Sequence, residues 1–434
     1  MSRSERAARA IEVGAEAGER PGAGATGGAE AEAGTAGGGP LARLLPMLTL
    51  GHAAMFMVYI GIGGVLLPVQ IEQIDPDGKI GSLGLVSGVA AIFATVFNPL
   101  AGLLSDRSRR RNPWILGGGL AAFATLALLG AVRTILLVTI AWCLVQATMN
   151  VYQAALTAIV PDRVAADRRG LASAMVGIGT PIGSVVGVML ATRFVPDDVD
   201  TGYLVLGAVT AVVAVLFTLL VRDERLPAVE TVPLRRQVAA FAETLRVADF
   251  RWAFTGRFLM MLGFFSVSLF QYYILQDHIT LPEGLDPEGA QAVLAPVDAV
   301  CTLLATVVGG LLSDRLGRRK PFIAVSCVLS AATMMIPVIQ PDWTGMLLFT
   351  ALAGISFGCF MAVDTALVTL VLPSADDAAR DLGVLNIANA GPQIIAPFVA
   401  SLVVGSLGYN ALYVVGALII ALGALSVAPI KSVR

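Results

Sequence analysis

Hydrophobic residues follow Pro40 in long runs, and short polar segments separate the runs. Each run is long enough to cross the hydrocarbon core of a bilayer, which takes about 20 residues of α-helix. The runs are expected to be helical because lipid offers no partner to unpaired backbone N–H and C=O groups. The spans predicted from this pattern are residues 43–71, 80–104, 114–132, 135–160, 171–191, 202–221, 250–276, 289–312, 321–340, 345–372, 383–406 and 409–429.

The composition fits a membrane protein and excludes several other classes. Hydrophobic residues make up 56% of the 434 residues and charged residues 14%, whereas soluble domains carry about 25% charged residues. A net charge of −2 gives no electrostatic basis for a nucleic-acid partner. The four cysteines lie inside apolar runs, which is typical of packing residues rather than of a disulfide or zinc framework. No cofactor or metal is expected.

Arginine and lysine are distributed unevenly between the polar loops. The loops on one side of the predicted spans carry 18 of them, and the loops on the other side carry three. Because positively charged loops tend to stay in the cytoplasm, a multi-pass protein of the plasma membrane with both termini inside is predicted. Residues 1–40 are rich in Gly, Ala, Glu and Arg, show no signal peptide and are predicted to form a disordered cytoplasmic tail.

An internal duplication is the strongest signal in the sequence. Residues 102–113 read GLLSDRSRRRNP and residues 310–321 read GLLSDRLGRRKP, an offset of 208 residues from 102 to 310. A second pair, VPDRVAADRRGLASAM from Val160 and LPSADDAARDLGVLNI from Leu372, repeats at nearly the same offset. Such repeats predict two similarly oriented six-helix halves. The boundaries expected are 41–221 for the first half, 222–249 for a cytoplasmic linker and 250–430 for the second half.

The duplicated loops suit a tight cytoplasmic turn. Their glycines would let neighbouring helices approach closely, and their aspartates would meet a helix N-terminus or an arginine. One interpretation is that the arginines only fix the topology. The interpretation we favour is an ionic latch that holds one conformation and opens in another. Its candidate residues are Gly102, Asp106, Arg107, Arg110, Gly310, Asp314, Arg315 and Arg318.

These paired loops resemble the signature of the major facilitator superfamily over about residues 41–430. The resemblance implies an all-α membrane fold of about twelve transmembrane helices in two six-helix halves. SDRSRRRNPWILGG, YILQDHI, AVDTALVTLVLP and DLGVLNIANAGPQIIAP are also similar to segments of the glycoside–pentoside–hexuronide cation symporters and the sucrose–proton symporters. That branch implies sugar uptake coupled to protons or sodium, although the loop after Asp106 is several residues shorter than the arginine-rich loop of the branch.

Ionisable residues within spans are costly to bury and therefore indicate function. Arg257 and Asp364 are predicted to pair, since their helices line the cavity in the resembled superfamily; proton coupling and a static pair both remain open. Asp298 lies in mid-span, where a carboxylate out of water holds a proton more readily, and is the leading coupling candidate over a packing role. His52 is interpreted as a solvated interfacial histidine rather than a proton relay, which remains the alternative.

Amide side chains form stripes on two predicted helices. Residues spaced i, i+4 and i+7, as in the first stripe, or i, i+3 and i+7, as in the second, share one helical face and could bind substrate hydroxyls or hydrogen-bond neighbouring helices. Substrate binding is favoured for the 135–160 stripe and packing for the 383–406 stripe. A polar and aromatic patch near 271–273 would suit stacking on a sugar ring or a flat drug. The residues are Gln146, Asn150 and Gln153 in the first stripe, Asn386, Asn389 and Gln393 in the second, and Gln271, Tyr272 and Tyr273 in the patch.

The function predicted is secondary active transport of a small solute, a sugar or glycoside, by proton- or cation-coupled alternating access. A monomer and no enzymatic activity are expected. An ATP-driven pump is disfavoured because the Gly78-Lys79 pair is followed by Ile80 rather than Ser or Thr. The alternative is a proton-coupled exporter of drugs or secondary metabolites, which Gly179, Gly183 and Gly187 would suit, although their spacing equally predicts close helix packing.

Overall fold

A computed structural model describes residues 39–225, 247–317, 319–371 and 378–430, and leaves out the side chains of 39–40, 166 and 365–387. Most of the predicted tail and linker, the latch candidate Arg318 and the side chain of Asn386 therefore lie outside the described residues. Residues Arg43–Arg434 form one compact unit.

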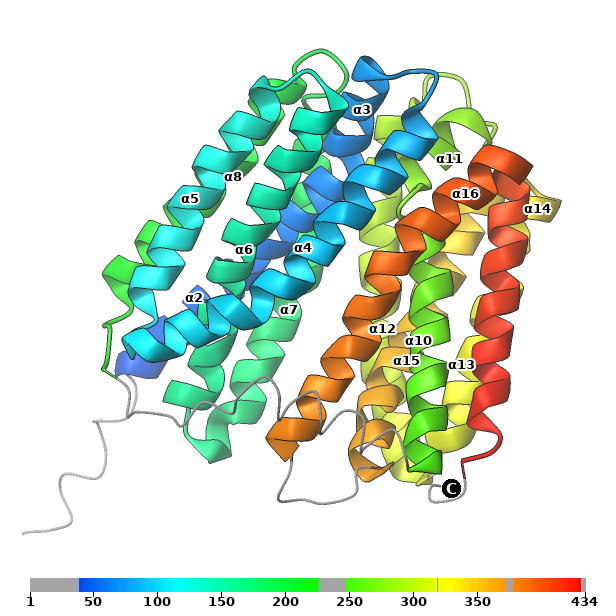
Figure 1. The fold of residues 1–434 in the computed structure, drawn as a ribbon. Helices are drawn as coiled ribbons and strands as arrows, with labels where there is room; N and C mark the ends of the chain where they lie inside the picture. The colour runs from blue at the N-terminus through cyan, green and yellow to red at the C-terminus, as the bar shows by residue number, and fades with distance from the viewer. Residues whose placement is uncertain (1–38, 226–246, 318, 372–377, 431–434) are drawn as a thin grey trace, which may run out of the picture. The chain divides into compact units, whose positions relative to one another are not determined.

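Nearly all of the described chain is helical (Figure 1). The first half contains α2 (Gly39–Gly61), a π-helical turn η1 (Ile62–Leu66), α3 (Leu67–Ile74), α4 (Lys79–Ser108), α5 (Asn112–Ala131), α6 (Ile135–Arg163), η2 (Ala166–Arg168), α7 (Arg169–Thr192) and α8 (Val199–Leu220). The second half contains α10 (Ala248–Ser268), α11 (Gln271–Asp277), α12 (Pro287–Leu316), α13 (Arg319–Thr333), α14 (Ile336–Ile339), α15 (Trp343–Val371) and α16 (Ala378–Val427).

The number of apolar helices agrees with the membrane fold that was predicted. Within the described residues, ten helices are long and apolar enough to cross a bilayer, and α10 with α11 makes an eleventh span bent by 45°. Gly408 interrupts α16 with φ 82° and ψ 179°, and Figure 1 shows the chain turning back there, between orange and red. Dividing α16 at Gly408 gives a twelfth span, at the break expected between 406 and 409.

Two predicted helices are less regular than expected. The helix predicted over 250–276 is bent between α10 and α11, and the helix predicted over 321–340 is broken between α13 and α14. Pro337 stands in the first turn of α14, where a residue without a backbone N–H is tolerated. Hydropathy reports the length of a span but carries no information on a bend inside it, which explains both differences.

The internal repeat is also visible in the conformation and contacts of the duplicated loops. We call the end of the helices that carries these arginine-rich loops the basic end, and the other end the opposite end. Arg109 with φ 57° and Gly317 with φ 60°, one repeat apart, end α4 and α12 in the left-handed region. Arg111 pairs with Asp106 at 2.7 Å, and its counterpart Arg319 pairs with Asp314 at 3.5 Å.

The residue after each of these arginines also makes an equivalent contact in the two halves. Asn112 Nδ2 donates to the carbonyl of Val221 at 2.6 Å, just beyond the end of α8. Lys320 Nζ donates to the carbonyl of Ala428 at 2.6 Å, just beyond the end of α16. Both bonds tie the third helix of a half to its sixth helix, so the duplicated sequence folds into duplicated structure.

Three glycines of α7 pack directly on α2, as their spacing predicts. A Cβ atom built on any of them would lie closer than 3.0 Å to a backbone carbonyl oxygen of α2. Only glycine therefore allows this approach of the two backbones. The facing pairs are Gly179 with Thr49, Gly183 with Ala53 and Gly187 with Met57.

Replacing Gly183 with valine is expected to destabilise the protein by about 1–3 kcal/mol or more, the usual cost of overpacking a core. A Cβ there would lie 2.1 Å from the Ala53 carbonyl oxygen, and backbone cannot move aside cheaply. Gly177→Val is the matched control on the same helix, because a Cβ at Gly177 meets no atom within 4 Å. Thermal unfolding in detergent compares them, and equal midpoints would contradict the packing described here.

Candidate transport site and gates

A buried ion pair joins α10 to α15 in the second half. Arg257 Nη1 donates to Asp364 Oδ2, and Arg257 Nε donates to Asn389 Oδ1 of α16 at 3.0 Å. Arg257 is 5% exposed and Asp364 is 2% exposed. The pairing predicted for Arg257 and Asp364 is confirmed, and Asn389, an amide of the 383–406 stripe, is part of the same cluster.

The contacts of this cluster lower the cost of burying its two charges. A single charge inside a span is very costly, whereas an oppositely charged partner with good hydrogen bonds offsets much of that cost. Asn389 satisfies a further guanidinium N–H and fixes the plane of the Arg257 side chain. The three helices that meet here can therefore respond together when either charge is neutralised or drawn toward another ligand.

Asp298 is a second carboxylate within a span; it is half-buried and separate from this cluster. It lies on α12, beside Gly354 of α15, and accepts a hydrogen bond from Thr302. Gly354 precedes Asp364 by ten residues on α15, which corresponds to roughly 15 Å along the helix axis. In the part of the chain that the structure describes, Asp298 has no cationic partner. The two acidic candidates thus occupy different levels of the second half.

The prediction that His52 is solvated is wrong. The imidazole is 3% exposed, its Nδ1 lies 2.9 Å from the Leu48 carbonyl oxygen, and its Nε2 is buried with no hydrogen-bond partner among the described residues. The cause is the close approach of α7, since a Cβ on Gly179 would lie 3.2 Å from the Cβ of His52. His52 is therefore buried between two helices rather than placed at an interface.

The amide stripe of α6 faces α2 in part. Tyr59 of α2 donates its hydroxyl to Gln153 Oε1 at 3.0 Å, while Asn150 Nδ2 donates to the Gln146 carbonyl at 2.8 Å within α6. Gln146 and Gln153 are half-buried and Asn150 is buried. The amides of Gln153 and Asn150 are thus engaged in hydrogen bonds, the first between helices and the second within α6, and Gln153 with Tyr59 forms a polar pair on two neighbouring helices.

The aromatic patch near α11 is buried in this structure rather than open to a ligand. Tyr272 donates to Glu288 Oε1 at 2.5 Å, and Tyr273 donates to the Pro68 carbonyl of the first half at 2.7 Å. Both rings are buried, and Gln271 beside them is half-buried. The stacking on a sugar ring predicted for this patch is therefore not possible in this conformation.

Contacts between the two halves gather at the opposite end. Lys79 Nζ lies 2.9 Å from Glu72 Oε1 in its own half and 3.0 Å from Asp277 Oδ2 in the other half. It also sits 4.7 Å above the Tyr273 ring, a cation–π arrangement. Gln276 Nε2 donates to Glu72 Oε1 at 3.0 Å, which adds a second bond across the halves.

The π-helical turn η1 contributes to the same closure. Gln291 of α12 donates Nε2 to the Gly64 carbonyl at 3.1 Å, a carbonyl that lies inside this turn. Close packing of α4 on α16 continues the contact, since a Cβ on Gly84 would lie 2.4 Å from Ser401 and one on Gly88 would lie 2.4 Å from the Phe398 ring. The halves are therefore held together at the opposite end by ion pairs, hydrogen bonds and interlocked helices.

Burial also removes a charge from this region. Burial lowers the pKa of His278, which follows α11, and a hydrogen bond with Asn410 opposes this lowering only in part. The imidazole is therefore neutral near pH 7. The charges at this closure are those of the lysine and the carboxylates, with Tyr409 donating to Asp277 Oδ2 at 2.7 Å.

The ionic contacts at the basic end centre on Arg111, which nothing in the sequence distinguishes from the neighbouring arginines. Its guanidinium lies 2.7 Å from Asp106 and 2.7 Å from Asp162 of α6, and donates to Ser105 Oγ at 2.7 Å. Arg163 in turn pairs with Asp223 at 3.0 Å. These bonds link α4, α5, α6 and the segment after α8 within the first half.

The other latch candidates make fewer or longer contacts than Asp106. Arg107 and Arg315 are exposed, and Arg110 Nε lies 3.9 Å from Asp223. A Cβ on Gly102 would meet no atom within 4 Å, and one on Gly310 would meet only Ala362 at an ordinary 3.8 Å. The close helix approach predicted at these two glycines is therefore wrong for this conformation.

Comparison with known proteins gives one family. The family model of the Major Facilitator Superfamily matches residues 48–297 and 284–431. No curated protein sequence matches the chain.

Solved structures of several transporters share the fold. The structure of a nucleoside transporter, NupG, aligns with a TM-score of 0.71 at 16% identity, covering 89% of this chain and 97% of that one. A POT family transporter in complex with 5-aminolevulinic acid aligns with a TM-score of 0.69 at 12% identity, covering 88% and 95%. The human organic anion transporter MFSD10 aligns with a TM-score of 0.64 at 15% identity, covering 89% and 99%. At these identities the likeness concerns the fold.

Proposed function

Since the chain belongs to the Major Facilitator Superfamily, we propose that this membrane transporter takes up a small polar solute, a sugar or glycoside, together with a proton. Asp298 carries this proposal, because it is a carboxylate in the middle of a span whose described partner is the neutral Thr302. A carboxylate held in this way can exchange a proton as water access changes during the transport cycle. The family and the fold argue for a transporter rather than an enzyme.

The protein is proposed to lie in the plasma membrane with its basic end facing the cytoplasm. The excess of arginine in the loops of that end supports this orientation. The closure around Lys79 would then face outward, and the conformation described here would be closed to the outside. Alternating access requires this closure to open while the basic end closes. Proton binding at Asp298 would bias that equilibrium, and substrate would bias it further.

The sugar assignment rests on hydrogen-bonding groups and on sequence resemblance. Gln153 and Tyr59 pair across α6 and α2, and Gln146 lies on the same face of α6. Neutral amide and phenol groups of this kind match the many hydroxyls of a sugar. The Arg257 cluster would hold α10, α15 and α16 together around the same passage.

Proton flux in proteoliposomes tests the proposal. Purified protein is reconstituted with a pH-sensitive dye inside the vesicles and is offered sucrose, maltose and other sugars. Sugar-induced proton entry is expected. In Asp298→Asn, accumulation against a gradient should vanish while exchange of substrate across the membrane survives, since an asparagine cannot carry the proton.

The matched control is Asp200→Asn, which neutralises an aspartate half exposed beside Arg133, and should leave proton-coupled uptake unchanged. Accumulation that persists in Asp298→Asn would remove this residue from the coupling site. A protein that ignores every sugar but moves protons with cationic dyes or hydrophobic antibiotics would be the proton-coupled exporter instead.

A further inference from the structure

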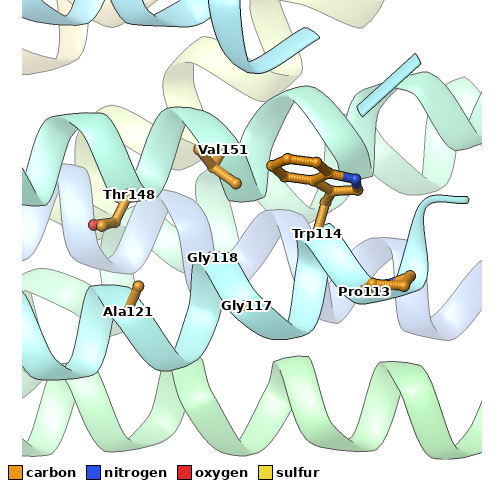
Figure 2. Close-up of a pocket in the computed structure, with 7 residues that line it drawn as sticks. All are labelled: Pro113, Trp114, Gly117, Gly118, Ala121, Thr148 and Val151. Carbon is orange, nitrogen blue, oxygen red and sulfur yellow. The ribbon is translucent and has the colours of Figure 1, made fainter. Parts of the chain in front are cut away.

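An apolar groove lies between α5 and α6, close to the basic end (Figure 2). Its volume is about 420 Å³, and its walls include Pro113, Trp114 and Gly117 of α5 with Thr148 and Val151 of α6. The Thr148 hydroxyl donates to the Leu144 carbonyl at 3.1 Å within its own helix, so it offers no free donor to a ligand. The groove is therefore lined for hydrocarbon and not for a sugar.

Two adjacent glycines explain why the groove exists. At Gly118 the helices touch, because a Cβ there would lie 2.8 Å from the backbone nitrogen of Tyr152. At Gly117, one residue earlier and turned about 100° around the helix, a Cβ would meet no atom within 4 Å. Gly118 lets α5 and α6 touch, and the missing side chain at Gly117 leaves the groove open beside that contact.

A fixed indole, that of Trp114, lines the groove, and the cationic Arg110 precedes it by four residues in the chain. Trp114 Nε1 donates to Ser108 Oγ at 2.7 Å, and Ser108 Oγ donates to the Arg110 carbonyl at 3.0 Å. Ser108 therefore joins Trp114 to the backbone of Arg110. Figure 2 shows the Trp114 ring standing between α5 and α6. Arg110 is 60% exposed, and its ion pair with Asp223 is long at 3.9 Å. Its charge is therefore available to another anion.

The groove belongs to the periphery of the first half. α5 packs chiefly on α6 and α8, whereas the Arg257 cluster belongs to α10, α15 and α16. A groove between two membrane spans on this flank meets acyl chains, and tryptophan is typical of the level of the lipid head groups. Basic pockets between spans at that level attract anionic head groups.

We propose that the groove binds an anionic phospholipid, with one acyl chain beside Gly117 and Trp114 and the phosphate at Arg110. The acyl chain matches the apolar walls, and the negative head group complements Arg110, whose backbone is joined to Trp114 through Ser108. A bound head group would compete with Asp223 for Arg110, and Asp223 also pairs with Arg163. The lipid would thus sit next to the ionic contacts of the basic end.

Native mass spectrometry of the full chain tests this. The protein is delipidated and titrated with phosphatidylglycerol or with phosphatidylcholine of the same acyl chains. One phosphatidylglycerol is expected to bind with about fivefold or greater preference over phosphatidylcholine, the contribution of a single arginine near the head groups. Arg110→Gln should remove that preference, and Gly117→Leu should fill the groove and lower retention of both lipids.

Matched controls separate this site from general lipid adhesion. Arg168→Gln removes another arginine of the basic end, 50% exposed with a 3.8 Å ion pair, and should keep the preference. Gly405→Leu fills another open glycine, whose Cβ would meet no atom within 4 Å, and should keep retention. Equal retention of the two lipids by the unmodified protein would overturn the proposal, and so would unchanged retention in Gly117→Leu with an unchanged unfolding midpoint.

Discussion

Replacing Arg257 with glutamine is expected to destabilise the protein by about 3–5 kcal/mol and to abolish uptake, because it leaves Asp364 buried without its cation. Asn389 also loses the donor that its Oδ1 accepts. The loss should appear as a lower midpoint of thermal unfolding in detergent and as uptake equal to that of empty vesicles.

Two further variants decide what the pair does. In Arg257→Gln with Asp364→Asn neither side chain is charged, so most of the stability should return. If uptake also returns, the pair is a static structural element, whereas restored stability without uptake assigns it to transport. Arg133→Gln breaks the exposed pair with Asp200, whose side chains are 58% and 50% exposed, and should cost at most about 1 kcal/mol. A midpoint for Arg257→Gln no lower than that of Arg133→Gln would contradict the prediction.

The features that the sequence predicted well are those with local causes. A span must be apolar along its whole length, so hydropathy locates it, and the break at Gly408 follows from the polar and glycine-containing segment between two spans. The glycine spacing of α7 predicted contact with a neighbouring helix, because a stripe of absent side chains has few other uses inside a membrane. Arg257 and Asp364 could be paired because unpaired charges are rarely buried there.

The features that it missed depend on contacts between distant segments. Arg111 is one of four arginines between positions 107 and 111, and only the fold decides which of them turns inward to Asp162. His52 looked interfacial from its place along the helix, and only the approach of Gly179 buries it. Lys79 lies in a polar segment between two predicted spans, and nothing near it in the sequence points to its partner Asp277, 198 residues away in the chain.

Holding the opposite end closed is expected to stop transport. Glu72 and Gln276 face each other across the two halves, with Gln276 Nε2 donating to Glu72 Oε1 at 3.0 Å. With cysteine at both positions, a short cleavable thiol crosslinker should join the halves and reduce uptake to the level of empty vesicles. Cleaving the linker should restore uptake, because the halves must separate at this end in each transport cycle.

A crosslink inside one half distinguishes a gate from a general loss of mobility. Arg133 and Asp200 pair within the first half, so cysteines at these two positions test the same chemistry without joining the halves. Uptake should survive that crosslink. Single-cysteine versions of each variant show whether the four native cysteines, which are buried or half-buried, react at all. Normal uptake with Glu72→Cys and Gln276→Cys fully crosslinked would mean that the halves do not part here, and the passage would have to open elsewhere than at the contacts around Lys79.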